Sequence, residues 1–216
     1  MTSPRINPAL SKILDEAYAP CPGFTGACQG IATWAPERGH VPRGFLGAFG
    51  DLEEVKLVLV VAEPGNPYPG DSHDTSGGPT AMVERMSRIV LELYQRGHDL
   101  YHRNMSFILD GCFPGESLVE QLRKVWITES YLCSAPVEGG AVPARACREC
   151  RRRFLERQIA LLPGAVVATL GGKAAARTKG LNTVAARAIS PPGCNHKGSR
   201  ESWLEVIRLV RESAGK

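Results

Sequence analysis

Two short apolar stretches, far apart in the chain, carry the strongest hydrophobic pattern. Residues 58–61 read Val-Leu-Val-Val and residues 125–128 read Val-Trp-Ile-Thr, and polar or turn residues follow both at once. Runs this short and this rich in β-branched side chains predict buried strands of a parallel sheet. A carboxylate follows each run, Glu63 in one case and Glu129 in the other. Ligands of open α/β sheets bind at the carboxyl ends of such strands, so we expect a functional site there.

The rest of the chain alternates between strand and helix signals. Short apolar runs predict strands at residues 56–61, 125–128, 166–170 and 185–189, with a further short strand at 106–109. Helices are predicted at residues 8–18, 80–96, 117–123, 145–162, 173–177 and 199–213. The alternation predicts an α/β fold: a three-layer α/β/α sandwich around a central, mostly parallel four-stranded sheet. At 216 residues one domain is expected, 1–216, with residues 1–54 as a cysteine-containing extension packed on it.

Charge and hydropathy narrow the class of protein only slightly. The formal net charge of +4 permits binding to nucleic acid, but an ordinary soluble enzyme also carries such an excess. No apolar run reaches the roughly 20 residues of a membrane span, and the amino terminus lacks the apolar core of a secretory signal. We therefore expect a cytoplasmic protein, bacterial in type, that does not interact with membranes.

Seven cysteines are many for a chain of this kind. Cytosolic proteins seldom keep disulfides, so clustered cysteines point to a metal, a cluster or redox chemistry. Cys147 and Cys150 form a C-x2-C pair at the start of a predicted helix, and Cys21 and Cys28 lie in the turn-rich region 20–50. That region is long for a loop, so something is expected to hold it in place. The alternative is a set of reduced, unligated thiols buried in the core.

Four motifs at predicted strand ends resemble the uracil-DNA glycosylase superfamily when they are read in order. They are Val-Ala-Glu-Pro-Gly at 61–65, the segment 129–136, Leu-Gly-Gly at 170–172 after a cysteine-containing helix, and the segment 189–196. The resemblance spans about residues 55–210. It implies that superfamily's fold and a DNA repair glycosylase that hydrolyses the N-glycosidic bond of uracil, with other deaminated bases as further substrates. No lysine lies where a Schiff base would form, so the enzyme would be monofunctional, and no nucleotide cofactor is implied.

The chain departs from the family pattern inside the pocket. Glu63 occupies the place of the residue that activates water in the best-known family, while Ala62 lies where some families carry an acid. Glu129 replaces the asparagine that reads the uracil edge. Ser190 stands at the family histidine, and the nearest imidazole is His196. The resemblance therefore predicts the fold more firmly than the base.

Cleavage of the bond develops positive charge on the sugar and negative charge on the base. A carboxylate orients water and stabilises the sugar cation, whereas a donor near the base oxygen stabilises the anion. We assign the first role to Glu63, with Asn66 holding the water, and the second to His196 or Asn195. A surface charge for Glu63 and a solvated loop histidine for His196 are the plainer alternatives.

Base recognition is assigned to Tyr68, Glu129, Ser190 and Asn195. Tyr68 would form an aromatic floor for a flipped base, unless it is a turn tyrosine packed on the core. A carboxylate only accepts hydrogen bonds, so Glu129 either has a raised pKa, leaves base reading to other groups, or prefers bases with more donors. It could equally pair with an arginine and never contact substrate.

Phosphate contacts are assigned to Lys197 and Arg200, ahead of the last helix, and to Lys173. Ordinary surface charge is the alternative for each one taken singly. The partner would be DNA, containing uracil or an abasic site, in single or double strands, and the protein a monomer.

Some branches of the superfamily carry a [4Fe–4S] cluster, and the cysteine layout here is similar. The resemblance implies Cys21, Cys28, Cys133 and Cys150 as ligands, with Cys147 as the alternative to Cys150. The first pair departs from the family spacing. Zinc, or no metal, remains open at these thiols.

Three other functions stay open. The same fold could release a different base, or could bind damaged or abasic DNA without catalysis. The chain could also be a metal- or cluster-dependent protein unrelated to DNA.

Overall fold

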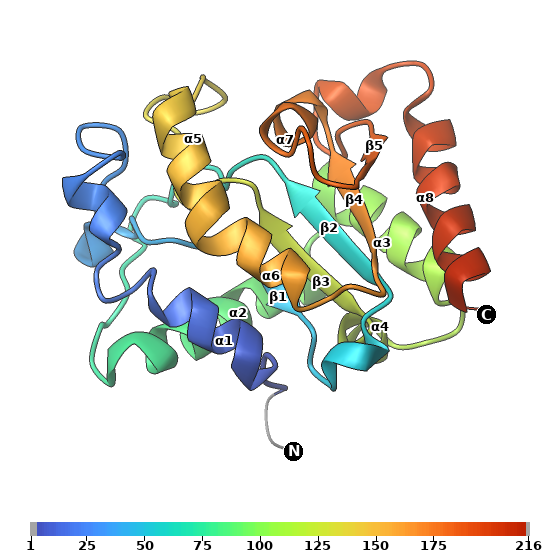
Figure 1. Cartoon of the computed structure of the whole chain (residues 1–216), viewed down its shortest axis with the longest axis horizontal. Coiled ribbons are helices and arrows are strands. Elements are labelled where there is room, and N and C mark those ends of the chain that lie inside the picture. Colours follow the sequence, from blue (N-terminus) through green and yellow to red (C-terminus); the bar gives the residue numbers. More distant parts are fainter. Residues whose placement is uncertain (1–3, 215–216) are drawn as a thin grey trace.

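A five-stranded mixed sheet forms the centre of the computed structural model, which describes residues 4–214 (Figure 1). The strands are β1 (Leu46–Gly47), β2 (Leu57–Val61), β3 (Val125–Glu129), β4 (Val166–Leu170) and β5 (Val184–Ala186). Their order across the sheet is β1-β3-β2-β4-β5. Strands β3, β2, β4 and β5 run parallel, while β1 pairs antiparallel with β3 at the edge.

The four parallel strands confirm the α/β class, but the predicted four-stranded sheet is wrong by one strand. Strand β1 has only two residues, and Gly47 has φ of +104°, a left-handed conformation that glycine adopts without strain. So short a strand leaves no periodic pattern to detect. The last strand, predicted at residues 185–189, is shorter and begins one residue earlier.

Helices cover both faces of the sheet. The face toward the viewer in Figure 1 carries α1 (Pro8–Asp15), α5 (Ala144–Cys150), a π-helical turn (Arg151–Leu155) and α6 (Glu156–Ala160). The other face carries α3 (Leu100–Cys112), α4 (Leu118–Arg123) and α8 (Ser199–Ala214), whose apolar side chains pack on Leu57, Leu59 and Ile127. Each face of the sheet has its own hydrophobic core, and helix α2 (Gly78–Arg96) contributes to both. Met82 and Met86 lie in the core that contains Val58, and Leu91 lies in the core that contains Leu57. The short α7 (Gly172–Arg177) follows β4 directly.

The helix beginnings follow the sequence. Ser117 caps α4 in a capping box with Glu120. The strand predicted at 106–109 is wrong, because those residues lie inside α3. Asp99 caps that helix by accepting a hydrogen bond from the His102 N–H, and the buried side chains Met105, Ile108, Leu109 and Cys112 repeat at helical spacing.

Region 20–50 is held against the sheet by packing and backbone hydrogen bonds. Short 3₁₀ turns form at Pro22–Thr25 and Pro36–Arg38, and others lie at Leu52–Glu54 and Gly193–Asn195. The Arg43 N–H donates to the Leu132 carbonyl at 2.8 Å, and Cys28, Val41 and Phe45 join the core beneath β2. Residues 6–48 thus pack in one core with the sheet. Within residues 4–214, no helix combines the length and apolar character needed to cross a bilayer.

Candidate functional site

The carboxyl ends of β2, β3 and β4 bring four charged side chains together: Glu63, Glu129, Lys173 and Arg177. Val61 pairs with Glu129 at the end of the β2–β3 ladder, and the pairing continues past the strands through Ser130 N–H to the Val61 carbonyl at 2.8 Å. The chain passes from β2 to β3 on one side and later to β4 on the other, so a topological switch point lies beside β2. Glu63, two residues beyond β2, stands at this point.

Glu63 is held by two cations from α7, on the far side of the switch point. Lys173 Nζ lies 2.6 Å from Glu63 Oε1, and Arg177 Nη1 lies 2.5 Å from Oε2. The Glu63 side chain is 8% exposed and the Arg177 side chain 10%. The Arg177 N–H groups are directed at the Ala62 carbonyl (2.7 Å) and Ser130 Oγ (3.2 Å), so its contact with Oε2 is ionic and Oε2 accepts no hydrogen bond. Lys173 also donates to the carbonyls of Gly139 and Gly140.

Glu129 is buried beside this ion pair. Burial raises the pKa of its carboxyl well above the usual range, the charge of Glu63 raises it further, and Arg177 and Arg43 oppose the shift. Gly44, with φ of +91°, packs so closely on it that a Cβ there would lie 2.5 Å from Glu129 Cγ. Glu129 Oε2 has no hydrogen-bond partner among the described residues. These surroundings favour the neutral form of the Glu129 carboxyl, which can both donate and accept a hydrogen bond.

The loop after Glu63 is tied down by residues that the sequence pattern did not single out. Arg43 and Ser134 both donate to the Gly65 carbonyl, Ser134 at 2.8 Å, and Arg43 also donates to Ser134 Oγ. Asn66 projects from this loop and its amide reaches Glu138 Oε2 at 3.5 Å. Tyr68 is 71% exposed and lines an open pocket together with Asn66.

The last motif lies on a separate, exposed loop. The side chains of Ser190, Asn195, His196 and Lys197 are exposed, and within residues 4–214 no hydrogen bond or ion pair joins any of them to Glu63. Arg200 is stacked on the Phe107 ring at 4.3 Å from its centroid. The structure therefore brings Glu63, Glu129 and Lys173 together. It leaves the other predicted base and phosphate contacts on separate loops and, for Arg200, at the start of α8.

Four of the seven cysteines line one small pocket. Cys21, Cys28, Cys133 and Cys150 surround it with apolar neighbours. Burial raises the pKa of the Cys133 thiol, and the other three thiols raise it further because they are close by. Cys147, the alternative ligand, points elsewhere, since its Sγ lies 3.6 Å from the Val142 carbonyl.

The pocket fits a group bound through sulfur. Backbone N–H groups of Gly23 and Leu132 donate to the sulfurs of Cys21 and Cys150, at 3.3 and 3.4 Å. A Cβ on Gly23 would stand 3.3 Å from Cys21 Sγ and 3.4 Å from Cys28 Sγ, so glycine keeps this wall open. No set of three His, Cys, Asp or Glu side chains in residues 4–214 is arranged to hold one metal ion. A four-iron cluster places one thiolate on each iron and so separates its ligands more widely than a single ion does.

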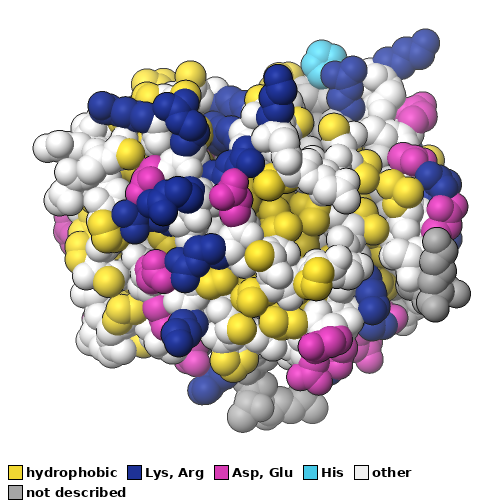
Figure 2. Space-filling view, viewed as in Figure 1, with side chains coloured by type: hydrophobic (Ala, Val, Ile, Leu, Met, Phe, Trp, Pro, Cys, Tyr) yellow, Lys and Arg dark blue, Asp and Glu magenta, His cyan; other side chains and the backbone are white. Residues whose placement is uncertain are grey.

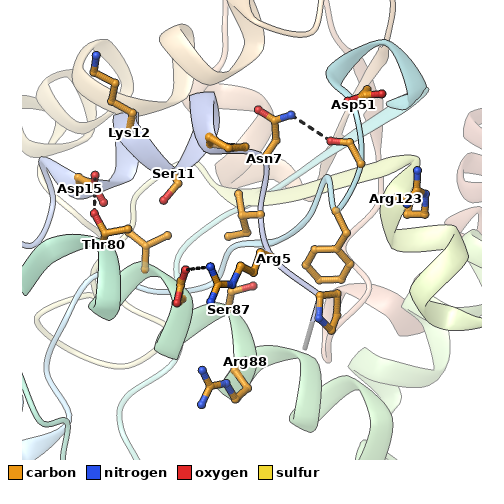
Figure 3. Close-up of a pocket in the computed structure, with 17 residues that line it drawn as sticks. Arg5, Asn7, Ser11, Lys12, Asp15, Asp51, Thr80, Ser87, Arg88 and Arg123 are labelled. Atoms are coloured by element: carbon orange, nitrogen blue, oxygen red, sulfur yellow. Dashed lines mark hydrogen bonds and ion pairs between the residues drawn. The ribbon is translucent and has the colours of Figure 1, made fainter. Parts of the chain in front are cut away.

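A pocket of about 880 Å³ lies elsewhere, between α1, α2 and the Phe49–Asp51 segment that leads toward β2 (Figure 3). Its charged residues are largely engaged with one another or with neighbours: Arg5 pairs with Glu84 at 3.4 Å and Thr80 donates to Asp15 at 3.1 Å. It is lined from the amino-terminal side of the sheet and contains none of the predicted site residues. We therefore place the candidate site at Glu63.

Comparison of the chain with protein-family models and with curated proteins finds no match.

Proposed function

We propose that the protein is a monofunctional DNA glycosylase that hydrolyses the N-glycosidic bond of uracil or another deaminated base. The observation that carries the proposal is the Glu63 carboxylate at the switch point of a parallel sheet, where such folds bind ligands. The sequence resemblance to the uracil-DNA glycosylase superfamily supports it. Three of the four motifs lie at the carboxyl ends of β2, β3 and β4, and the fourth lies in the segment after β5. The proposal includes that superfamily's sheet arrangement and a cytoplasmic site of action on DNA.

Glu63 would orient a water molecule and stabilise positive charge on the sugar. In the free protein its charge is balanced by Lys173 and Arg177. The Lys173 side chain is 40% exposed, so a DNA phosphate can compete for it and release Glu63 Oε1. Arg177, which is buried and bonded to the Ala62 carbonyl, would stay in place and fix the other oxygen.

Glu129 would read the base as a neutral acid. A protonated carboxyl offers one donor and one acceptor side by side, the same pattern as an asparagine amide. It could donate to a base carbonyl and accept from the adjacent ring N–H, as uracil and hypoxanthine present them. Asn195 and His196, on the exposed loop after β5, remain the candidates for stabilising negative charge on the departing base.

Cys21, Cys28, Cys133 and Cys150 would hold a [4Fe–4S] cluster. The cluster's role would be structural: it would fasten region 20–50 to the segment after β3 and to α5. Metal coordination would also deprotonate thiols that burial otherwise keeps neutral.

The experiment that tests this function is base release from single-stranded oligonucleotides, each carrying one uracil, hypoxanthine or xanthine, followed by alkaline cleavage of the abasic product. Cleavage at one modified position supports the glycosylase and identifies its base. A folded protein that cleaves none of the three contradicts it.

A second function, binding of abasic DNA without catalysis, is favoured by the ion pairs of Glu63. Both of its oxygens lie within 2.6 Å of a cation and the side chain is almost closed to solvent, which weakens it as a base. Tight binding to an abasic oligonucleotide, together with no release from any of the three bases, would support this function instead.

A further inference from the structure

The positive charge of the chain is concentrated on one helical segment. Residues 144–160 contain six arginines and two glutamates, an excess of four, which equals the formal net charge of the whole chain. This segment comprises α5, the π-helical turn and α6. Figure 2 shows Lys and Arg side chains gathered over the area where Figure 1 draws α5 and its surroundings. Charge asymmetry of this kind marks a surface for a polyanion.

Three arginines of the segment form an outward-facing row, which we call the arginine stripe: Arg145, Arg148 and Arg152. Their spacing of three and four residues places them on one side of the helix, whereas Cys150 and Phe154 face the core. Within residues 4–214, Arg148 makes no ion pair or side-chain hydrogen bond. Arg145 only approaches the Gln29 carbonyl at 3.4 Å. Arg152 pairs with Glu149 at 3.1 Å, yet its side chain is 65% exposed. An exposed ion pair of this kind is weak, so a phosphate can compete with Glu149 for Arg152, while Arg145 and Arg148 face solvent.

The stripe is joined to the candidate site through Arg151. Its Nη1 donates to the carbonyls of Arg177 at 3.0 Å and Lys179 at 2.9 Å, which fixes the carboxyl end of α7 against the segment. Lys179 is exposed and has no ion-pair partner in the described part of the chain, so it extends the positive surface. Arg177 in turn contacts Glu63. One side of the molecule thus carries positive charge from α5 to the candidate site.

The composition of this surface selects the partner. Residues 144–160 expose no large hydrophobic side chain, whereas protein interfaces are built around an apolar centre. A row of cations without such a centre suits the sugar–phosphate backbone of nucleic acid. The first turn of α8 is less suited, because Arg200 is already stacked on Phe107.

We propose that the arginine stripe and Lys179 bind the phosphates of the DNA strand flanking the nucleotide at Glu63. This inference rests on the proposed action on DNA, and it does not require that a base be released. The same surface would serve the non-catalytic binder.

The test is fluorescence anisotropy with a labelled single-stranded 20-mer carrying one abasic-site analogue, measured over a series of NaCl concentrations. The variant is Arg148→Gln with Arg152→Gln. The matched control, Arg96→Gln with Arg208→Gln, removes the same charge from α2 and α8, where both arginines pair with glutamates. Thermal unfolding of all three proteins verifies that they are folded.

We expect the stripe variant to bind the oligonucleotide about tenfold more weakly at 0.1 M salt. The slope of the logarithm of its binding constant against the logarithm of the salt concentration should decrease in magnitude by about 1.4, and the control should bind like wild type. Equal loss in both variants, or none in either, would overturn the inference. So would displacement of the DNA by poly-glutamate at equal charge concentration, which would indicate an acidic protein partner. If the wild-type protein releases uracil and the stripe variant binds DNA as tightly as wild type, the inference is refuted and the proposed function stands.

Discussion

Lys173 Nζ lies 2.6 Å from Glu63 Oε1 although 110 residues separate the two in the chain. The contact joins the turn after β2 to the helix after β4, across the switch point of the sheet. Arg177, one turn further along α7, approaches the other oxygen of Glu63. The chemistry proposed here depends on how these cations share the carboxylate with DNA.

The two cations should differ sharply in their effect on stability. Arg177→Met leaves a buried carboxylate without its closest cation, so we expect a loss of about 3 kcal/mol in the free energy of unfolding. Lys173→Met removes a half-exposed partner and should cost about 1 kcal/mol or less. Urea unfolding measures both. Equal losses of unfolding free energy in the two variants would contradict the idea that burial makes the Arg177–Glu63 pair more important for stability than the Lys173–Glu63 pair.

Glu129 should give the protein a characteristic pH dependence. The pKa of Glu129 is higher in the folded than in the unfolded protein. Its contribution to the free energy of unfolding is therefore fully present below the unfolded pKa, about 4.3, and is lost as pH rises through the folded pKa. Glu129→Gln mimics the neutral acid permanently. We expect the stability of this variant relative to wild type to grow with pH above about 4.3.

Denaturant unfolding between pH 4 and pH 9 checks this dependence. Glu138→Gln, an exposed acid on the neighbouring loop, serves as the control and should show no such trend. A constant difference between Glu129→Gln and wild type at every pH would show that folding does not shift the pKa of Glu129.

The two cysteines of the C-x2-C pair should behave differently. Cys150→Ala removes a thiol from the four-cysteine pocket, so we expect loss of the broad visible absorption of a cluster and of thermal stability. Cys147→Ala, one turn away on α5 and outside that pocket, should retain both. Anaerobic purification followed by absorption spectra and iron analysis measures the outcome. A colourless, iron-free and fully stable wild-type protein would refute the cluster.

The sequence predicts those parts of the fold that arise from local pattern. The runs that form β2, β3 and β4 are apolar and β-branched over their whole length, so their positions could be read directly. Strand β1 could not, because two residues carry no period. Residues 106–109 were misassigned because a short apolar window in a helix looks like a strand until the cap at Asp99 is considered.

The site was predictable in its carboxylates but not in their partners. Glu63 and Glu129 follow strand ends that the sequence marks, whereas the ion pair with Lys173 depends on how β4 and α7 lie beside β2. Sequence alone assigned Lys173 to a phosphate and did not consider Arg177 or Arg43. Likewise, Cys147 and Cys150 are equivalent in the pattern, and only the packing of α5 shows which of them faces Cys133.

The most direct test of the central claim is single-turnover release of uracil from a single-stranded oligonucleotide by wild type, Glu63→Gln and the control Glu53→Gln, which changes an exposed acid ahead of β2. We predict that Glu63→Gln slows release by about 100-fold or more while its affinity for the abasic product persists, and that Glu53→Gln matches wild type. A folded Glu63→Gln protein that releases uracil at the wild-type rate would contradict the assignment of the site to Glu63.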